Sequence, residues 1–221
     1  MMIYHIRRAS AAVDLGAPFE AWDNCETMRI DRPAPGNWPY QPETQLRLQY
    51  DDRGLYGLFQ VRDSAIRCVR RNFQDEVCGD SCVEFFVMPM HGVGYSNFEI
   101  NASGVMLTMH IEDETRLDDG FFKRFRFLTE EEVKDVRIFH TLPDFIPEEI
   151  TQETTYRVGF FLPFSLFGKI YGAPVPRSGT VWRGNAYKCG DETSKPHYFS
   201  WNPIDELNFH LPRCFGELVF E

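Results

Sequence analysis

The sequence lacks the long apolar segments that mark membrane and exported proteins. No apolar run approaches the length of a bilayer span, and the first residues, MMIYHIRRAS, have no apolar core of the kind found in a signal peptide. We therefore expect a cytoplasmic protein with no membrane partner. The alternative is a secreted or periplasmic protein from which a leader has been removed.

Positive charge is also scarce. The chain has 23 Lys and Arg against 33 Asp and Glu, which gives a formal net charge of −10. Nucleic acids and anionic membranes are bound by clustered Lys and Arg, so we expect no nucleic-acid partner. The one dense basic stretch, FFKRFRF (121–127), alternates charge with Phe, and this pattern indicates a strand with an outward basic face.

Cysteine is too dilute for a disulfide scaffold, with six residues in 221. No C-x-x-C pair is present, and Cys78 and Cys82 have no second pair near them in sequence, so neither a zinc knuckle nor a redox motif is indicated. Cys189 with His197, or Cys214 with His210, could complete a zinc site only if folding brought them together. We expect reduced thiols, with Cys82 facing inward at the start of a strand.

The chain is rich in aromatic residues, with 20 Phe and 9 Tyr, and this composition favours strands. TQLRLQY (44–50) and LYGLFQV (55–61) flank the turn DDRG and predict a β-hairpin. Further strands are predicted at 82–88, 95–101, 104–111, 157–164, 181–189, 197–201 and 216–221.

These short strands, with no linker or internal repeat between them, predict an all-β fold. We expect an immunoglobulin-like or jelly-roll-type antiparallel β-sandwich that forms a single domain over residues 1–221. The segment 128–136 is a short helix capped by Thr129 and Glu132, or else an exposed loop. At most one helical turn is expected in PFSLFG (163–168).

Two carboxylates lie within predicted strands. Glu84 alternates with apolar neighbours, and Glu99 does the same in FEIN, with Asn101 two residues further on the same face. If strands 82–88 and 95–101 pair, these three side chains form a polar cluster on one face. The cluster is either the ordinary solvent side of a sheet or the carboxylate pair of a glycosidase.

Several segments, in their order along the chain, resemble one family. They are YDDRGLYGLFQVRD (50–63), GDSCVEFFV (79–87), YSNFEINASG (95–104), VWRGNAYKCGD (181–191), SWNPID (200–205) and FHLPRCFGELVF (209–220). Together they are similar to the family 9 carbohydrate-binding modules and to the wider set of bacterial family 9-like proteins. The resemblance runs from about Trp22 to the C-terminus. It implies a β-sandwich that binds sugar, found attached to xylanases and other glycoside hydrolases or as a free-standing protein.

The resemblance also implies where a sugar site would lie. Two tryptophans clamp the sugar in the xylanase-borne modules, and Cys78 and Phe209 stand at those positions here. The family glutamate is present as Glu84. Glu99 replaces an arginine that the family places two residues before its asparagine, here Asn101.

Other aromatic residues could serve instead of the missing tryptophans. Trp38 lies in the Pro-rich loop PGNWPYQPE, and Trp201 follows Tyr198 and His197 near a second loop. Asn185, Lys188 and Asp191 are close to that loop in sequence. The candidate sugar-binding set is Trp38, Cys78, Glu84, Glu99, Asn101, Asn185, Lys188, Trp201 and Phe209.

The expected function is non-catalytic binding of an oligosaccharide or polysaccharide, such as xylan, during polysaccharide breakdown. One alternative is a haem-b-binding sandwich that uses residues among Met88, Met90, Met106, Met109 and His110. Another is a glycoside hydrolase that uses Glu84 and Glu99. No cofactor is firmly indicated, although the resemblance allows a structural calcium ion and EDETRLDD (112–119) offers oxygen ligands. The oligomeric state stays open.

Overall fold

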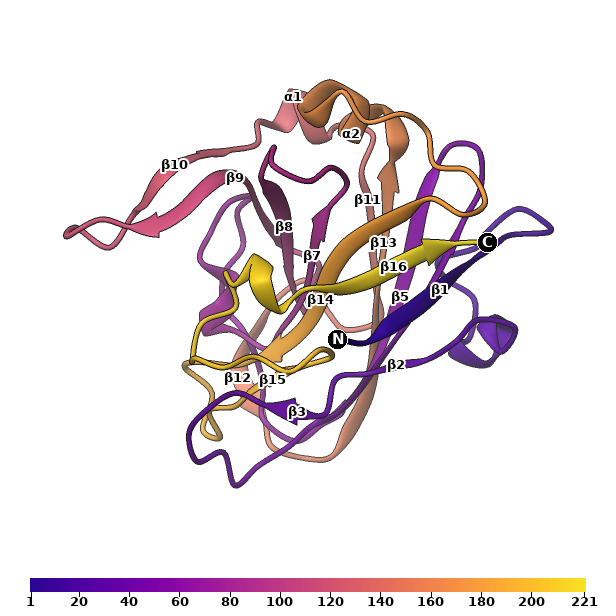
Figure 1. Ribbon diagram of the computed structural model, residues 1–221. Helices are drawn as coiled ribbons and strands as arrows, with labels where there is room; N and C mark the ends of the chain where they lie inside the picture. The colour runs from indigo at the N-terminus through magenta and orange to yellow at the C-terminus, as the bar shows by residue number, and fades with distance from the viewer.

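The computed structural model describes all 221 residues and has two sheets of a β-sandwich that share one strand (Figure 1). The first sheet has the order β10-β9-β8-β7-β14-β16-β1, and the second has the order β1-β4-β5-β13-β11. The strands of the first sheet are β10 (Phe122–Phe127), β9 (Met106–Arg116), β8 (Tyr95–Asn101), β7 (Cys82–Met88), β14 (Val181–Cys189), β16 (Gly216–Phe220) and β1 (Ile3–Arg8). Those added by the second are β4 (Glu43–Tyr50), β5 (Gly54–Asp63), β13 (Thr154–Pro163) and β11 (Arg137–His140).

Five short strands extend this framework. β2 (Met28–Arg29) pairs with β4, β15 (Tyr198–Ser200) pairs with β14, and β3 (Arg32–Pro33) pairs with β15. β6 (Ile66–Cys68) and β12 (Ile146–Ile150) form a separate two-stranded ribbon. The predicted all-β sandwich is confirmed, since the chain has 16 strands and only two α-helices.

β1 is the part of the sandwich that departs from the antiparallel prediction. Its first half pairs with β16 and its second half with β4, and both pairings are parallel. The strand therefore carries backbone hydrogen bonding from one sheet to the other. Its two-sided role gives no signal in the short sequence IYHIRR, and the sequence analysis did not identify it as a strand.

The predicted hairpin is present as β4 and β5. The Asp51 carboxylate accepts hydrogen bonds from the backbone N–H groups of Arg53 and Gly54, at 2.8 and 3.2 Å, and so closes the turn. β5 then pairs on its other edge with β13 over ten residues. These two pairings make β5 a central strand, which agrees with its apolar run LYGLF (55–59).

The helices differ in part from the prediction. α1 (Glu130–Val133) is one turn, and Thr129 and Glu132 form the expected capping box at its start. α2 (Phe164–Tyr171) has eight residues, so the expectation of at most one turn there was wrong. It extends because Leu166, Phe167 and Tyr171 bury one face against the core, and Gly172 ends it with a φ of 66°. Neither helix is long and apolar enough to span a bilayer.

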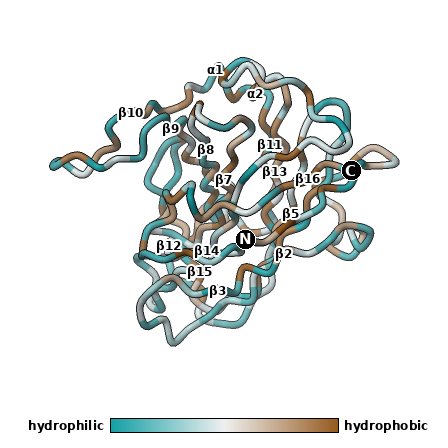
Figure 2. Tube along the Cα trace, viewed as in Figure 1, coloured by the Kyte–Doolittle hydropathy of each residue, from teal (hydrophilic) through white to brown (hydrophobic).

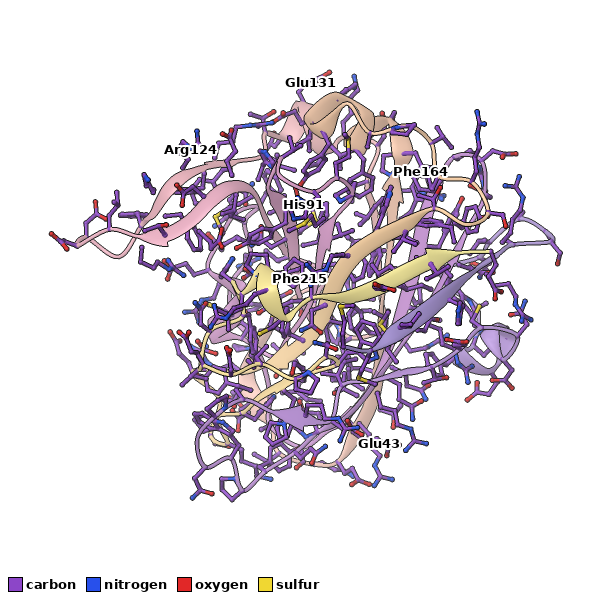
Figure 3. The ribbon with its side chains drawn as sticks, viewed as in Figure 1. Glu43, His91, Arg124, Glu131, Phe164 and Phe215 are labelled. Carbon is purple, nitrogen blue, oxygen red and sulfur yellow. The ribbon has the colours of Figure 1, made fainter.

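The core lies between the two sheets, and Figure 2 shows hydrophobic stretches along the strands that enclose it. On β7, Val83, Phe85 and Val87 point into this core. Cys82 and Phe86 point to the other face, and so does Glu84 between them. The outer face of the first sheet is covered in turn by the segment before β16, and Phe215 of that segment is labelled in Figure 3.

Candidate functional site

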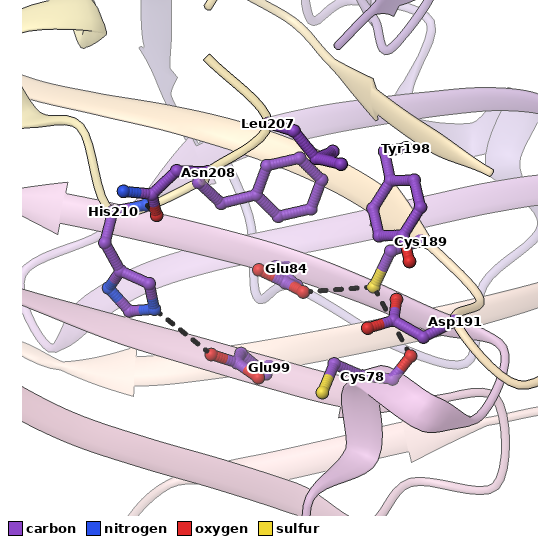
Figure 4. A pocket seen from close by; sticks show the side chains of 10 residues that line it. Cys78, Glu84, Glu99, Cys189, Asp191, Tyr198, Leu207, Asn208 and His210 are labelled. Atoms are coloured by element: carbon purple, nitrogen blue, oxygen red, sulfur yellow. Dashed lines mark hydrogen bonds and ion pairs between the residues drawn. The ribbon is translucent and has the colours of Figure 1, made fainter. Parts of the chain in front are cut away.

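A cleft of about 330 Å³ opens on the outer face of the first sheet. β7, β8 and β14 form its floor, and its walls come from the turn after β14, from β15 and from the segment 207–210. The side chains that line it are shown in Figure 4; they are Cys78, Glu84, Glu99, Cys189, Asp191, Tyr198, Leu207, Asn208, Phe209 and His210.

Strand pairing places the two predicted glutamates together on the floor. β7 and β8 are antiparallel, and Glu84 lies directly opposite Glu99 in their register. Side chains at directly opposite positions project to the same face with Cβ atoms about 5 Å apart. The alternation that placed both glutamates on one face of the sheet was therefore read correctly from the sequence.

Each glutamate has one hydrogen-bond donor. The Cys189 thiol donates to Glu84 Oε1 at 3.2 Å, and Asn97 Nδ2 donates to Glu99 Oε1 at 2.7 Å. Burial raises the pKa of both carboxyl groups, and the charge of Glu99 raises that of Glu84 further. The pKa of Glu99 rises to about 7. At neutral pH the pair therefore retains protons that exposed glutamates would have lost.

His210 approaches the same pair without neutralising it. Its Nε2 lies 4.0 Å from Glu99 Oε1, and its Nδ1 lies 3.0 Å from the Tyr95 hydroxyl. Burial, with a smaller effect from Arg116, lowers the pKa of His210 to about 3. The imidazole is neutral at physiological pH, so its contact with Glu99 is not an ion pair.

The aromatic wall of the cleft is Phe209 and Tyr198. The Phe209 ring stacks on Tyr187 with centroids 4.2 Å apart and an interplanar angle of 12°. Tyr198 meets Phe209 at 6.2 Å and packs on its other side against Trp38, at 4.5 Å. These contacts fix two rings that line the cleft while leaving both partly exposed.

Three thiols surround the floor, and all are reduced. Cys78 lines the cleft, while Cys82 begins β7 with no exposed surface. Cys82 is buried on the outer face of the first sheet, so the expectation that it faces inward was wrong about the face. Cys82, Glu84 and Cys189 each place one ligand-type atom within 4.8 Å of the others. This group mixes two soft thiols with one carboxylate, a donor set unlike the all-oxygen set that calcium prefers.

The acidic stretch 112–119 offers no comparable group. It lies at the end of β9 and in the turn to β10, where Asp113 pairs with Lys123 at 3.3 Å and Glu112 pairs with Arg124 at 3.8 Å. Arg124 marks this projecting hairpin in Figure 3. Two of its carboxylates are thus paired with basic side chains of β10, whose predicted outward basic face is present.

The structure brings Cys78, Glu84, Glu99 and Phe209 of the candidate set into the cleft and leaves the other five outside it. Trp201 is 2% exposed and packs edge-on against Tyr4 in the core, so its ring is not available to a ligand. Trp38 stands behind Tyr198 and donates from Nε1 to the Ala34 carbonyl at 3.0 Å.

The three polar candidates outside the cleft have structural partners. Asn101 donates to Asp80 Oδ2 at 3.0 Å and accepts from the backbone of the turn after β8. Asn185 bonds the Asn202 backbone N–H and carbonyl, at 2.8 and 2.9 Å. Lys188 points to the opposite face of β14, where Nζ lies 3.4 Å from Asp63 Oδ2.

Sequence reasoning missed Leu207 and Asn208 of the wall, and it named Cys189 and His210 only as remote zinc candidates. Tyr198 and Asp191 were noted near a loop but not included in the candidate set. The segment 207–210 has no periodic pattern, and its place over the floor depends on how it folds back before β16.

The residues of the haem hypothesis are not gathered at one site. Met109 belongs to the apolar cluster on the cleft side of β9, whereas His110 points to the opposite face. There its Nδ1 lies 3.2 Å from the Tyr171 hydroxyl. The two side chains therefore cannot ligate one iron from the same side of the sheet.

Comparison with known proteins agrees with this architecture. The model of carbohydrate-binding family 9 matches residues 21–220. The crystal structure of a provisionally assigned carbohydrate-binding protein from Bacteroides uniformis is 28% identical, covers 99% of both chains and superimposes with a TM-score of 0.84. Comparison with curated proteins gives no match.

A family 9 carbohydrate-binding module from Caldicellulosiruptor kristjanssonii has been solved with glucose and with cellotriose. Each structure is 16% identical to this chain, covers all of it and has a TM-score of 0.65, with 96% and 94% of the module covered. This likeness shows that the fold is shared.

Proposed function

The chain belongs to carbohydrate-binding family 9, and from that premise we propose that its cleft binds a short saccharide without cleaving it. One observation carries the proposal: the partly exposed Phe209 ring and the carboxyl groups of Glu84 and Glu99 line the same cleft. Sugars present apolar C–H faces to aromatic rings and a rim of hydroxyls to hydrogen-bonding groups. The cleft offers both.

The ligand proposed is an oligosaccharide of glucose, xylose or mannose units, such as one released from xylan. The complexes of the Caldicellulosiruptor kristjanssonii module with glucose and cellotriose support this class. In the present cleft, Phe209 and Tyr198 would contact a ring face, and Glu84, Glu99 and Asn208 would bond hydroxyls.

The test is calorimetric titration with cello-, xylo- and manno-oligosaccharides. Phe209→Ala should lower the affinity of the bound sugar about tenfold or more, because it removes the apolar contact of the ring. Phe121→Ala is the matched control, since Phe121 is 58% exposed on the β9–β10 hairpin and lies outside the cleft. If no sugar gives a heat of binding, the proposal is overturned. If Phe209→Ala and Phe121→Ala lose affinity equally, the sugar binds outside the cleft.

The paired carboxyls also bear on the hydrolase hypothesis. A glycosidase places its acid and its base or nucleophile on either side of the scissile bond. Glu84 and Glu99 lie directly opposite each other on one face of the sheet, a close spacing of the kind that retaining glycosidases also use, so a measurement of turnover decides between the two hypotheses. A hydrolase would release reducing ends from the same oligosaccharides and would lose this turnover in Glu84→Gln; the binding proposal expects no turnover in either protein.

A further inference from the structure

The cleft has an unusual charge balance for a site that would hold a neutral ligand. Three of its lining side chains carry carboxyl groups, Glu84, Glu99 and Asp191, and none is a lysine or arginine. Its one imidazole, His210, is held neutral by burial. No basic side chain of the cleft can therefore compensate an ionised carboxylate.

The buried carboxyl groups also retain unused hydrogen-bonding capacity. Glu84 is 2% exposed and Glu99 is 6% exposed, yet each accepts one hydrogen bond, at Oε1 in both cases. Oε2 of each side chain has no hydrogen-bond donor in the protein. Figure 4 shows both carboxyl groups within the same space, where a ligand could reach them.

Two cations close to the cleft are committed elsewhere. Lys188 lies on the opposite face of β14, with Nζ 3.4 Å from Asp63 and 2.8 Å from His197. Arg70 forms two hydrogen bonds to Glu192, at 2.8 and 2.7 Å. The cleft thus has acceptors for a positive charge and no resident group that supplies one.

We propose that the cleft prefers a saccharide carrying a protonated amine, an oligosaccharide of unacetylated glucosamine, over its neutral counterpart. This inference rests on the proposed function and specifies the ligand class of the same site. The ammonium group would donate to the free Oε2 atoms of Glu84 and Glu99, while the sugar ring contacts Phe209. Charge-assisted hydrogen bonds of this kind are about twice as strong as neutral ones.

Binding of an ammonium group has a thermodynamic signature that a neutral sugar lacks. The pKa of Glu99 is raised to about 7 and that of Glu84 is raised as well, so near pH 6 the pair holds protons. A bound cation favours the ionised carboxylates, so it lowers both pKa values and releases protons to the buffer. The other titratable side chains around the pair are Cys78, Cys82, Tyr95, Tyr187, Cys189, Asp191, Tyr198 and His210, with Lys188 behind the sheet.

The experiment compares three β-1,4-linked disaccharides that differ at C2: the glucosamine dimer, its N-acetylated form and cellobiose. Each is titrated calorimetrically at about pH 6, in two buffers of different ionisation enthalpy, so that proton release is measured with affinity. We expect the glucosamine dimer to bind at least about tenfold more tightly than cellobiose and to release more protons.

Variants assign the preference to the cleft. Glu99→Gln should reduce the ratio of the two affinities about tenfold, because it removes one carboxylate charge and keeps a side chain that can bond a hydroxyl. Asp191→Asn removes a carboxyl charge of the same cleft at an exposed position and should reduce the ratio in the same direction. Glu148→Gln is the matched control, because Glu148 is exposed on β12 and its loss changes the net charge equally.

The outcomes separate this inference from the function on which it rests. Equal or tighter binding of cellobiose would overturn the preference and leave saccharide binding intact. A preference lost equally in Glu148→Gln would assign it to the overall negative charge and overturn the role of the cleft. Absence of binding by all three disaccharides and by the neutral oligosaccharides would overturn both.

Discussion

Glu84 on β7 and Glu99 on β8 lie directly opposite each other on neighbouring strands, both are buried, and no lysine or arginine lines the space above them. Such a pair destabilises the folded state when both groups ionise, because burial removes water and each charge repels the other. Groups with strongly shifted pKa values concentrate at functional sites. The pair therefore links the stability of the fold to the chemistry of the cleft.

We expect the free energy of unfolding to fall as the pH rises from about 6.5 to 8. Glu99 has a pKa of about 7 in the folded protein against an ordinary value of 4.5, so the folded state binds more protons across this range. Stability contributed by the protonated carboxyl is full below pH 4.5 and is lost as the pH rises through 7. Urea unfolding at a series of pH values measures this slope.

Histidines act in the opposite direction at lower pH. The pKa values of His197 and His210 are lowered from 6.5 to about 3, so the unfolded chain binds more protons between these values and stability rises with pH there. Glu99→Gln isolates the carboxyl from this background. Above pH 6.5, the free energy of unfolding should fall less in Glu99→Gln than in the parent protein. Parallel plots of this free energy against pH for the two proteins would contradict the prediction.

Lys188 provides a test of which face of β14 carries the site. Its Nζ and the Asp63 carboxylate are 3.4 Å apart with neither side chain exposed. Lys188→Met should lower the free energy of unfolding by about 3 to 5 kcal/mol, because it leaves the Asp63 charge buried and unpaired. Urea unfolding measures the loss, and the further change Asp63→Asn should restore part of it.

Saccharide affinity should not change in Lys188→Met, since the side chain points away from the cleft. Calorimetric titration of the folded variant checks this point. A loss of affinity as large as that of Phe209→Ala would show that the site extends through the sheet and that the cleft alone does not define it.

The parts of the fold that the sequence predicted are those set by local alternation. Glu84 and Glu99 could be placed on one face because each lies between apolar neighbours and the two strands pair in register. The DDRG turn was equally readable, since the Asp51 carboxylate bonds within four residues. Local rules of this kind operate without knowledge of the partner sheet.

The parts that were not predicted depend on contacts between distant segments. β1 pairs in parallel with both β16 and β4, and nothing within residues 3–8 encodes either partner. Asn208 and His210 join the site because a segment without regular structure folds over β7 and β8. Trp201 was misjudged for the same reason, because its burial comes from Tyr4 at the other end of the chain.

Cys78 should report occupancy of the cleft through its rate of alkylation. Its thiol lines the cleft and is partly exposed, and burial together with the charges of Glu99 and Glu84 raises its pKa. The thiolate is the reactive form, so iodoacetamide should modify Cys78 slowly at neutral pH and faster as the pH rises. A saturating saccharide should slow the alkylation of Cys78 about tenfold. Lower concentrations should slow it less, according to the fraction of clefts that are occupied.

Cys214 is the internal control for this measurement. It is also reduced and partly exposed, but it does not line the cleft, so its rate should be the same with and without sugar. Mass spectrometry of the peptides that contain the two cysteines follows both rates in one sample. Protection of both thiols would indicate a general tightening of the fold. Protection of neither thiol under saturating sugar would place the ligand outside the cleft. Protection of Cys78 alone requires that the ligand cover the floor beside Glu84 and Glu99.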